Sequence, residues 1–560
     1  MGTFPSHRGA IVTSAVGKWT ALWTRWNSRC EAPSMTTSRW KRCLFALAMV
    51  ALLLTGSTAW SDWGRGGDWP TWQGDKSGSR HNAAEHRITP GNVGKLELKW
   101  AFAYPKSGKE PRSQPAVVDG TAYFGGTDGK FYATDARTGS TRWSFDLASV
   151  TPAPVFVQDS PTVAQGKVYF GDDRGYVYAL NQRTGKLAWA KQYEQHADAR
   201  HSSSPLYHNG RIYLGSSAGE TDHSDPAYPC CTFRGHLDSI DADTGALVWR
   251  YYTVPEPKAV GTWPSGATRY EPSGAGIWSS PAIDERTGTL YVGTGQNYSG
   301  TGGDFDSLLA LDARTGVVRW KQQVTQADTW RVVCRKPDNE GFCPGQKDGT
   351  DLDYDLSSAP NLFRVNGRMM VGVGQKSGVY HVFDAKTGQV SWRRQLSEST
   401  SPASTGGIQW GTSYDGERLY VATYYGKPGT LFALNPANGD IHWQTPNPSN
   451  GCTWGGAAAY PKTCALAHAA AVTTSPGVVY LGSTDGKLRA YSARTGAVLW
   501  EYDTIRDFAG VNGLTGHGGA LPGAGGAVVA NGMVYTHSGY YPFYPSERGA
   551  VLLAFGLPRR

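Results

Sequence analysis

One nine-residue pattern of apolar and polar positions returns along the chain. At residues 135–143 it reads DARTGSTRW, a polar start, a Gly, and a Trp four residues beyond that Gly, after the apolar and aromatic run FYAT. Six further copies begin at Asn181, Asp241, Asp312, Asp384, Asn435 and Ser492. A strand, a turn whose Gly can adopt positive φ and a second strand with Trp form a β-hairpin. The pattern therefore predicts seven hairpins.

The copies recur at intervals of about 40 to 70 residues. Repeats of β-rich units at this spacing are typical of propeller blades. Because the repeat is continuous, we expect one closed domain over residues 60–560 rather than the several domains that 560 residues would suggest.

The two ends of this region complete an eighth unit. Trp100 closes the segment GKLELKW, which resembles the last strand of a blade, and GAVLLAFGLPRR at the C-terminus resembles the strand before the turn. A blade formed by both would close the ring and leave no edge strand. The sequence thus predicts an all-β, eight-bladed propeller whose last blade is closed by both termini.

Composition supports this fold and limits the partners. The 71 Gly, 21 Trp and 29 Tyr suit short strands, tight turns and aromatic packing. Residues 1–59 hold seven of the 54 Lys and Arg but one of the 46 Asp and Glu, so the net charge of +8 falls to +2 without them. Nucleic-acid binding needs a concentrated basic face, and we expect none.

Residues 1–59 are interpreted as a leader. From Met35, three basic residues precede an eleven-residue apolar run at 44–54 and the small residues Ser57-Thr58-Ala59, the order of a secretory signal peptide. The run is short for a membrane span. We expect an exported protein, periplasmic or secreted, with no stable membrane insertion after signal cleavage.

Six cysteines follow the leader, and an even number in an exported chain favours disulfides. The pairs nearest in sequence are the adjacent Cys230 and Cys231, Cys334 with Cys343, and Cys452 with Cys464, with the connectivity left open. The CxxCH motif does not occur, so no covalent c-type haem is expected.

Long insertions interrupt the repeat at residues 220–234, 255–276 and 325–357. Such loops on a rigid scaffold commonly carry function. The last contains Asp353 and Asp355, whose side chains would lie on one face of an extended segment and repel each other unless a cation intervened. A solvated acidic loop is the alternative.

The pattern AxDxxTGxxxW, complete at residues 133–143 and 310–320, resembles the tryptophan-docking motif of the quinoprotein alcohol dehydrogenases. The resemblance extends over nearly the whole chain after residue 68. It is strongest to the polyvinyl-alcohol dehydrogenase type without a cytochrome c domain, through CCTFRG, PSGAGIWSSPAID, GQKSGVYHVFD and GGIQWG. It implies an eight-bladed propeller that binds pyrroloquinoline quinone (PQQ) and a metal ion.

The resemblance also implies roles for residues near the cofactor. Trp278 matches the Trp on which the quinone lies, and Lys376 matches a basic side chain at the quinone oxygens. Asp353 matches the catalytic base, with Asp328 as the second candidate. Further cofactor contacts are implied for Ser202, Cys230, Cys231, Arg234 and Trp410. For the disulfide, contact with the ring and a purely structural role stay equally open.

For the metal, the resemblance implies Glu220, Asp353, Asp355 and an amide from Gln296 or Asn297. The family segment has Asn directly after GTG, whereas this chain has Gln296 there, so the amide ligand stays open between the two. Either offers a neutral oxygen to a hard cation. Calcium is the expected ion, and the second carboxylate makes a lanthanide the alternative.

These features together predict an exported PQQ-dependent dehydrogenase. Its expected substrate is a small or polymeric alcohol, secondary alcohols included. Electrons would pass to a separate soluble cytochrome c, because the chain has no haem motif. The alternative is a non-catalytic propeller that scaffolds other proteins; it would keep the Trp repeat and lose Glu220, Asp353 and Lys376.

Overall fold

The computed structural model describes residues 67–105, 111–335, 351–398, 406–424, 428–449, 466–468, 470–521, 523–539 and 548–559. The chain divides into two compact units, residues 1–61 and 62–560, and all described residues belong to the second. The expected leader, with its signal peptide, and Cys343, Cys452 and Cys464 lie outside the described residues. No helix in the described ranges is long and apolar enough to span a membrane.

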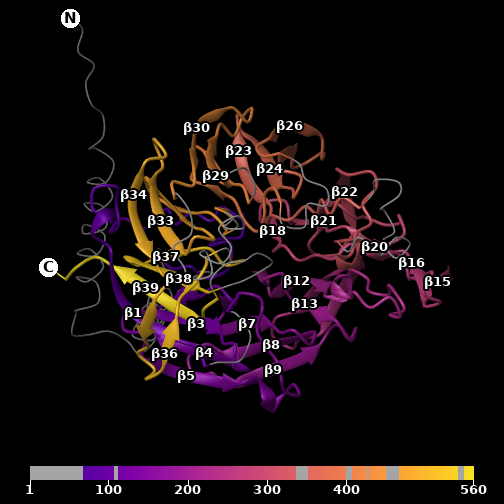
Figure 1. The fold of residues 1–560 in the computed structure, drawn as a ribbon, viewed down its shortest axis with the longest axis horizontal. Helices are drawn as coiled ribbons and strands as arrows, with labels where there is room; N and C mark the ends of the chain where they lie inside the picture. The colour runs from indigo at the N-terminus through magenta and orange to yellow at the C-terminus, as the bar shows by residue number, and fades with distance from the viewer. Residues whose placement is uncertain are drawn as a thin grey trace, which may run out of the picture. The chain divides into compact units, whose positions relative to one another are not determined.

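The described part is a ring of eight antiparallel sheets, as Figure 1 shows. Blade 1 contains β2 (Ala116–Val118), β3 (Thr121–Gly125), β4 (Lys130–Asp135) and β5 (Thr141–Asp146). Blade 2 contains β6 (Thr162–Ala164), β7 (Lys167–Gly171), β8 (Tyr176–Asn181) and β9 (Leu187–Gln192). Blade 3 contains β11 (Leu206–His208), β12 (Arg211–Ala218), β13 (His236–Asp241) and β14 (Leu247–Tyr252), with β10 (Ala199–Arg200) paired to β12. Blade 4 contains β18 (Ala282–Asp284), β19 (Thr289–Gly293), β21 (Ser307–Asp312) and β22 (Val318–Gln323).

The second half of the ring repeats this order. Blade 5 contains β23 (Asn361–Val365), β24 (Arg368–Gly374), β25 (Val379–Asp384) and β26 (Val390–Gln395). Blade 6 contains β27 (Ser413–Tyr414), β28 (Leu419–Ala422), β29 (Thr430–Leu434) and β30 (Ile441–Pro446). Blade 7 contains β31 (Thr473–Ser475), β32 (Val478–Gly482), β33 (Lys487–Ser492) and β34 (Val498–Asp503). Blade 8 contains β37 (Val528–Ala530), β38 (Met533–Ser538), β39 (Val551–Gly556) and β1 (Glu97–Ala103).

Blade 8 joins the two ends of the described chain, as the sequence predicted. The indigo strand β1 lies beside the yellow strand β39 in Figure 1, and Trp100 pairs with Ala554. The same register places Trp143 opposite Ala133 and Trp320 opposite Ala310 in complete blades. The N-terminal strand therefore takes the place of the Trp-bearing strand that follows the turn elsewhere.

The repeated Trp residues link each blade to the next. In every blade the indole N–H donates to a backbone carbonyl of the following blade. The pairs are Trp100 to Ala136 (3.1 Å), Trp143 to Gln182 (3.2 Å), Trp189 to Ala242 (3.0 Å), Trp249 to Ala313 (3.1 Å), Trp320 to Ala385 (3.0 Å), Trp392 to Pro436 (3.0 Å), Trp443 to Ala493 (3.0 Å) and Trp500 to Leu96 (3.1 Å). These bonds close a complete circle.

The glycine of the repeat serves both the turn and this contact. Gly245 has φ of +65°, and a Cβ there would lie 2.7 Å from the ring of Trp189 in the preceding blade. A side chain would strain the backbone and clash with the indole. This explains why Gly and Trp recur at fixed spacing.

Residues 69–82 form a segment that we call the N-terminal belt. It contacts the first strand of seven blades and the residue ahead of β11 in blade 3. These contacts are Trp69 with Val117, Thr71 with Thr162 (2.8 Å) and Pro205 (3.5 Å), Lys76 with Ile283 (2.8 Å), Ser77 with Leu362 (2.8 Å), Ser79 with Tyr414 (2.8 Å), Arg80 with Thr474 (2.9 Å) and Asn82 with Val529 (2.8 Å). The first strands of neighbouring blades contact one another, so the belt follows the inner wall of the ring.

The remaining elements lie ahead of β1 or in segments between blade strands. They are β15 (Lys258–Thr262) and β16 (Thr268–Glu271), β17 (Ser273–Gly274) and β20 (Asn297–Ser299), β35 (Asp507–Ala509) and β36 (Thr515–His517), and the 3-10 turns η1 (Val93–Lys95), η2 (Leu147–Ser149), η3 (Glu220–Asp222) and η4 (Val332–Arg335). The β15–β16 hairpin lies at the edge of the ring near β20 in Figure 1. Most of these insertions belong to blades 3 and 4, where the repeat spacing widens.

Candidate active site

The insertions and inter-blade loops enclose a cavity of about 650 Å³. Seven of the residues singled out from the sequence line it: Ser202, Trp278, Gln296, Asp353, Asp355, Lys376 and Trp410. They come from six separate stretches of chain between β10 of blade 3 and β27 of blade 6. The volume lies in the range of typical cofactor and small-ligand sites. The ring thus gathers most of the expected site into one space.

Lys376 lies between the two expected acids. Its Nζ is 2.9 Å from Asp353 Oδ1 and also forms an ion pair with Asp355 Oδ2. The side chain of Lys376 is 12% exposed and that of Asp353 1%. Burial raises the pKa of Asp353 to about 8, although Lys376 opposes this shift. A carboxyl with a pKa near neutrality can exchange a proton with a substrate hydroxyl.

Asp355 is held by neutral donors as well. The backbone N–H of Gln296 lies 3.0 Å from its Oδ1, and the indole N–H of Trp278 lies 3.3 Å from the same atom. The orientation of Gln296 that satisfies its amide directs the side-chain nitrogen to Asp355, 2.6 Å from Oδ1. Gln296 therefore acts as a donor to the carboxylate.

Asp328, the second candidate for the catalytic base, holds the backbone at Asp353 through hydrogen bonds. Asp353 has φ of +56°, an uncommon value for a residue with a side chain. The N–H groups of Asp353 and Tyr354 donate to the Asp328 carboxylate at 2.9 and 2.5 Å. Burial raises the pKa of Asp328 to about 6, and burial beside Asp328 raises that of Asp306 well above its usual value. Asp328 holds the loop that carries Asp353.

Two indoles form one wall of the cavity. The rings of Trp278 and Trp410 meet edge to face, with centroids 5.0 Å apart and planes at 75°. Lys376 Nζ lies 5.6 Å from the Trp278 ring centroid. Trp410 has φ of +59°. Its backbone N–H donates to Ser357 O (3.1 Å), and its carbonyl accepts from Ala359 N–H (2.7 Å). Trp278 thus presents an aromatic surface beside a cation and a basic carboxylate.

Glu220, expected to bind the metal, faces elsewhere. Its buried carboxylate accepts the N–H groups of Thr232 and Phe233, each with a contact of 2.8 Å, and the Tyr228 hydroxyl at 3.3 Å. Within the described ranges, the sole cluster of three His, Cys, Asp or Glu side chains with ligand atoms close enough to share one metal ion is Glu220 with Cys230 and Cys231. The structure does not join Glu220 to Asp353 and Asp355.

Asn297 fits a ligand role in one respect. Its Nδ2 donates to Gly300 O and Gly302 O, both at 3.0 Å, which fixes the orientation of the amide. Its Oδ1 is buried without a hydrogen-bond partner, and so is Asp353 Oδ2. Buried oxygens without donors are costly, and a cation would satisfy them.

Cys230 and Cys231 form a disulfide that is fully buried and packs against Ala218 and Tyr298, two residues of the cavity wall. The cysteines themselves do not line the cavity. The Trp263 indole donates to Cys230 O at 3.1 Å. The disulfide therefore supports the wall from behind.

Arg234, expected at the cofactor, lies outside the cavity. Its guanidinium donates to Val254 O at 3.2 and 3.1 Å and stacks 3.6 Å from the Tyr252 ring centroid. Gln409, the neighbour of Trp410, does line the cavity, and its side chain donates to Gly406 O at 3.2 Å.

Sequence reasoning missed several polar residues of the cavity wall. Asp198, Arg200 and Asp222 line it, and Arg200 pairs with Asp222 at 2.9 Å. Asp198 binds His223 at 2.9 Å. His223 and Asp222 stand in the 220–234 insertion already singled out, whereas Asp198 and Arg200 precede β11 without any motif that marks them.

Two family models match the chain. One, described as outer membrane protein assembly factor BamB, matches residues 51–261 and 375–532. The other, described as the β-propeller domain of glucose, ethanol and alcohol dehydrogenases, matches residues 192–333. The second match covers the stretch that supplies Ser202, Glu220, Trp278 and Gln296.

Relatives that match over most of the chain include polyvinylalcohol dehydrogenases. A polyvinylalcohol dehydrogenase of Pseudomonas sp. is 34% identical over 81% of this chain and 70% of its own length. A polyvinylalcohol dehydrogenase of Sphingopyxis sp. is 33% identical over 86% of this chain and 73% of its own. The crystal structure of the quinohemoprotein alcohol dehydrogenase of Comamonas testosteroni superposes with a TM-score of 0.61 at 20% identity, covering 89% of this chain and 82% of that one.

These relatives confirm the eight-bladed fold and the enzyme interpretation over the scaffold alternative. The cavity, with Trp278, Lys376 and Asp353 together, agrees with a PQQ-dependent alcohol oxidoreductase. The chain belongs to the PQQ-dependent quinoprotein alcohol dehydrogenases, and over most of its length it is similar to the polyvinylalcohol dehydrogenases.

Proposed function

We propose that this dehydrogenase oxidises its alcohol in the 650 Å³ cavity, with PQQ lying against Trp278. The observation that carries the proposal is the contact of Lys376 with both Asp353 and Asp355 beside the Trp278 ring. An aromatic surface, a cation and a buried carboxylate are what a flat anionic quinone and a substrate hydroxyl require.

PQQ, when bound, supplies a carbonyl carbon that accepts the hydride of the alcohol. Asp353 takes the hydroxyl proton, since its raised pKa suits it to that exchange. Lys376 stabilises negative charge on its neighbours, because its ammonium forms ion pairs with both Asp353 and Asp355. Trp278 and Trp410 keep water from the face that they cover.

For the metal ion we propose Asp353, Asp355 and Asn297 as ligands, with calcium as the ion. Asp353 and Asn297 each offer one buried oxygen that has no hydrogen-bond donor. Asp355 forms an ion pair with Lys376, as Asp353 does, so the two carboxylates share one neighbour. Gln296 donates to Asp355 and is the weaker choice of amide. Glu220 would join only by releasing three donors. A trivalent lanthanide is the alternative ion because the second carboxylate adds charge.

The proposed substrate is a secondary or polymeric alcohol, as the names of the polyvinylalcohol dehydrogenases suggest. The exposed Arg174 belongs to the lining, so the cavity reaches the surface. We further propose export by a leader at residues 1–59, a single propeller over 60–560, and a separate soluble cytochrome c as electron acceptor. These follow from the signal-like sequence and the missing CxxCH motif.

The experiment is reconstitution of purified apoprotein with PQQ and calcium. Dye-linked oxidation of polyvinyl alcohol and of short secondary alcohols is expected only when both are present. PQQ binding is measured separately by quenching of Trp fluorescence. An apoprotein that binds no PQQ would refute the proposal. Replacing calcium by a lanthanide tests the choice of ion.

A further inference from the structure

Lys376 lies in the turn that joins β24 to β25. The turn is closed by two backbone bonds of 3.0 Å, from Gly378 N to Gln375 O and from Gln375 N to Val379 O. One backbone bond joins the turn to the acids, from Lys376 N to Asp355 O at 3.1 Å. A lysine side chain has a flexible four-carbon stem, so its ammonium stays in place only where the backbone beneath it is held.

The side chain of Gln375 holds this turn from outside the cavity. Gln375 is 3% exposed and does not line the cavity. Its Nε2 donates to Thr325 Oγ1 at 2.8 Å, and its Oε1 accepts from Ser377 Oγ at 2.6 Å and from His381 Nε2 at 3.2 Å. Burial lowers the pKa of His381 to about 3, so its ring is neutral and carries one N–H, which an amide oxygen can accept at Nε2. The amide is therefore bonded at both of its ends.

Thr325 connects this amide to the segment that carries the proposed base. It opens the insertion between β22 and β23, three residues ahead of Asp328. The Asp328 carboxylate accepts the backbone N–H of Asp353 at 2.9 Å, and Lys376 Nζ lies 2.9 Å from Asp353 Oδ1. The contacts thus run in a closed chain from Gln375 through Thr325 and back to Lys376. A buried polar chain whose members are all bonded fixes their geometry.

We propose that Gln375, through its bond to Thr325, positions the Lys376 ammonium between Asp353 and Asp355. The proposal rests on the proposed function, in which Lys376 acts beside the quinone. Gln375 is a positioning residue, because it contacts the turn and the insertion and not the cavity. Without its bond to Thr325, the turn is joined to the acids by Lys376 alone, and the ammonium moves away from its two partners.

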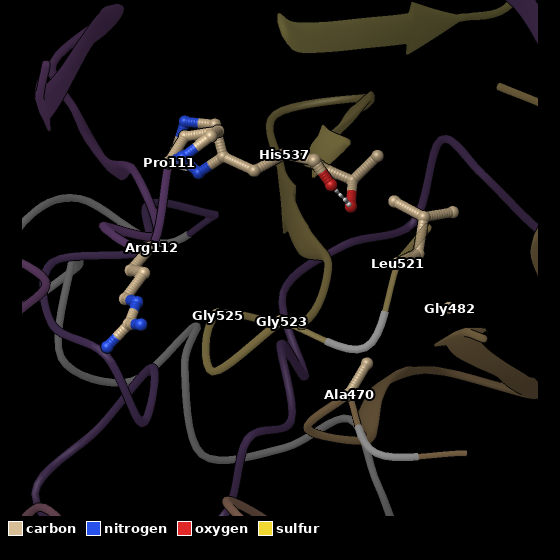
Figure 2. A pocket seen from close by; sticks show the side chains of 10 residues that line it. Pro111, Arg112, Ala470, Gly482, Leu521, Gly523, Gly525 and His537 are labelled. Atoms are coloured by element: carbon tan, nitrogen blue, oxygen red, sulfur yellow. Dashed lines mark hydrogen bonds between the residues drawn. The ribbon is translucent and has the colours of Figure 1, made fainter. Parts of the chain in front are cut away.

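Four variants isolate this bond. Gln375→Met removes the amide at similar length, Thr325→Val removes the hydroxyl that accepts from it, and Thr325→Ser keeps a hydroxyl there. Thr536→Val is the matched control, since it also removes a hydroxyl. Thr536 Oγ1 donates to His537 O at 3.2 Å beside a cavity of about 20 Å³ that Lys376 does not line (Figure 2). Circular dichroism and the melting temperature of each apoprotein monitor the fold.

The first measurement needs no cofactor. Apoprotein is treated with acetic anhydride, and acetylation of Lys376 is followed by mass spectrometry, with the exposed Lys95 as the internal reference. The wild-type amine should react slowly, because it is 12% exposed and paired with two carboxylates. Gln375→Met and Thr325→Val should raise its rate by about threefold or more, since the amine loses those partners. Thr325→Ser and Thr536→Val should stay within about twofold of wild type. Equal rates in wild type and Thr325→Val would overturn the proposal.

The second measurement uses protein loaded with PQQ and calcium. Thr325→Val should lower kcat by about tenfold and leave KM within about twofold, and Thr325→Ser should restore kcat. In a Lys376→Met background, Thr325→Val should change kcat by less than about twofold, because the side chain that it positions is gone. A full loss in that background would overturn the proposal. Wild-type protein that binds no PQQ would overturn the proposed function instead, and the acetylation rates would still decide the role of Gln375.

Discussion

Lys376 Nζ and Asp353 Oδ1 lie 2.9 Å apart in the wall of the cavity, and both side chains are largely buried. Each partner stabilises the charged form of the other. Burial raises the pKa of Asp353, and Lys376 opposes this rise. Burial lowers the pKa of Lys376, but Asp353 and Asp355 outweigh it and raise that pKa above its ordinary value. The pair therefore couples the charge of the proposed base, Asp353, to that of Lys376, the side chain proposed to contact the cofactor.

Replacement of Lys376 by Met tests this coupling. Without the ammonium, the pKa of Asp353 should rise, because burial and Asp355 both favour the neutral acid. The base must be ionised to accept a proton, so the acidic limb of the pH profile of kcat/KM should move to higher pH. The measurement is that profile for both proteins saturated with PQQ and calcium. If the Lys376→Met substitution lowers kcat/KM equally at every pH and leaves the acidic limb at the same pH, the coupling is contradicted.

Replacement of Asp353 by Asn should lower kcat by about 10² to 10⁴, the usual loss on removing a general base. Asp328→Asn should act differently. The Asp328 carboxylate accepts hydrogen bonds from two backbone N–H groups of the loop. An Asn side chain at this position should therefore destabilise the loop and weaken PQQ binding as well as turnover. PQQ titration and single-turnover rates separate the two effects. The base is Asp328 if the Asp328→Asn protein loses turnover at full PQQ affinity and the Asp353→Asn protein keeps its turnover.

Two tryptophans with different tasks give a third prediction. Trp249→Phe removes the 3.1 Å bond to Ala313 O between blades 3 and 4 and should lower the free energy of unfolding by about 1 to 2 kcal/mol. PQQ affinity should stay near wild type. Trp278→Ala should leave the melting temperature nearly unchanged and weaken PQQ binding at least tenfold, since it removes the aromatic surface. Urea unfolding measures the stability of both variants, and fluorescence titration measures their PQQ affinity. The two roles would be refuted if Trp249→Phe weakened PQQ binding and Trp278→Ala lowered stability instead.

The sequence predicted the ring because each repeat carries its own physical constraint. Gly245 must accept positive φ and the approach of Trp189, so neither residue can vary freely. The incomplete units at Trp100 and residues 549–560 predicted the shared blade for the same reason, and the pairing of β1 with β39 confirms it. Local constraints of this kind are readable without knowledge of distant contacts.

The site could be predicted only where a motif fixed a position in the ring. Trp278 lies just ahead of the first strand of blade 4, Lys376 lies between β24 and β25 of blade 5, and both line the cavity. Glu220 and Arg234 belong to an insertion whose path depends on the disulfide and on Thr232, Val254 and Tyr252. Contacts made by long insertions are not encoded in local spacing.

The N-terminal belt gives the last prediction, through its fully buried Arg80. This guanidinium donates to Val472 O (2.9 Å), Trp72 O (2.5 Å), Thr473 Oγ1 (2.8 Å) and Gly525 O (3.0 Å), which joins the belt to blades 7 and 8. Burial lowers the pKa of Arg80 to about 9, so it stays charged at neutral pH.

Arg80→Met should lower the free energy of unfolding by about 3 kcal/mol or more, because it leaves several buried acceptors without donors. The exposed Arg137, changed to Met, is the control and should shift stability by less than about 0.5 kcal/mol. Urea unfolding of the apoproteins measures both. Trp72 lies 4.5 Å from Arg80 and packs with Trp410, so loss of Arg80 should also weaken PQQ binding. A stable Arg80→Met protein would show that the belt does not hold the ring together.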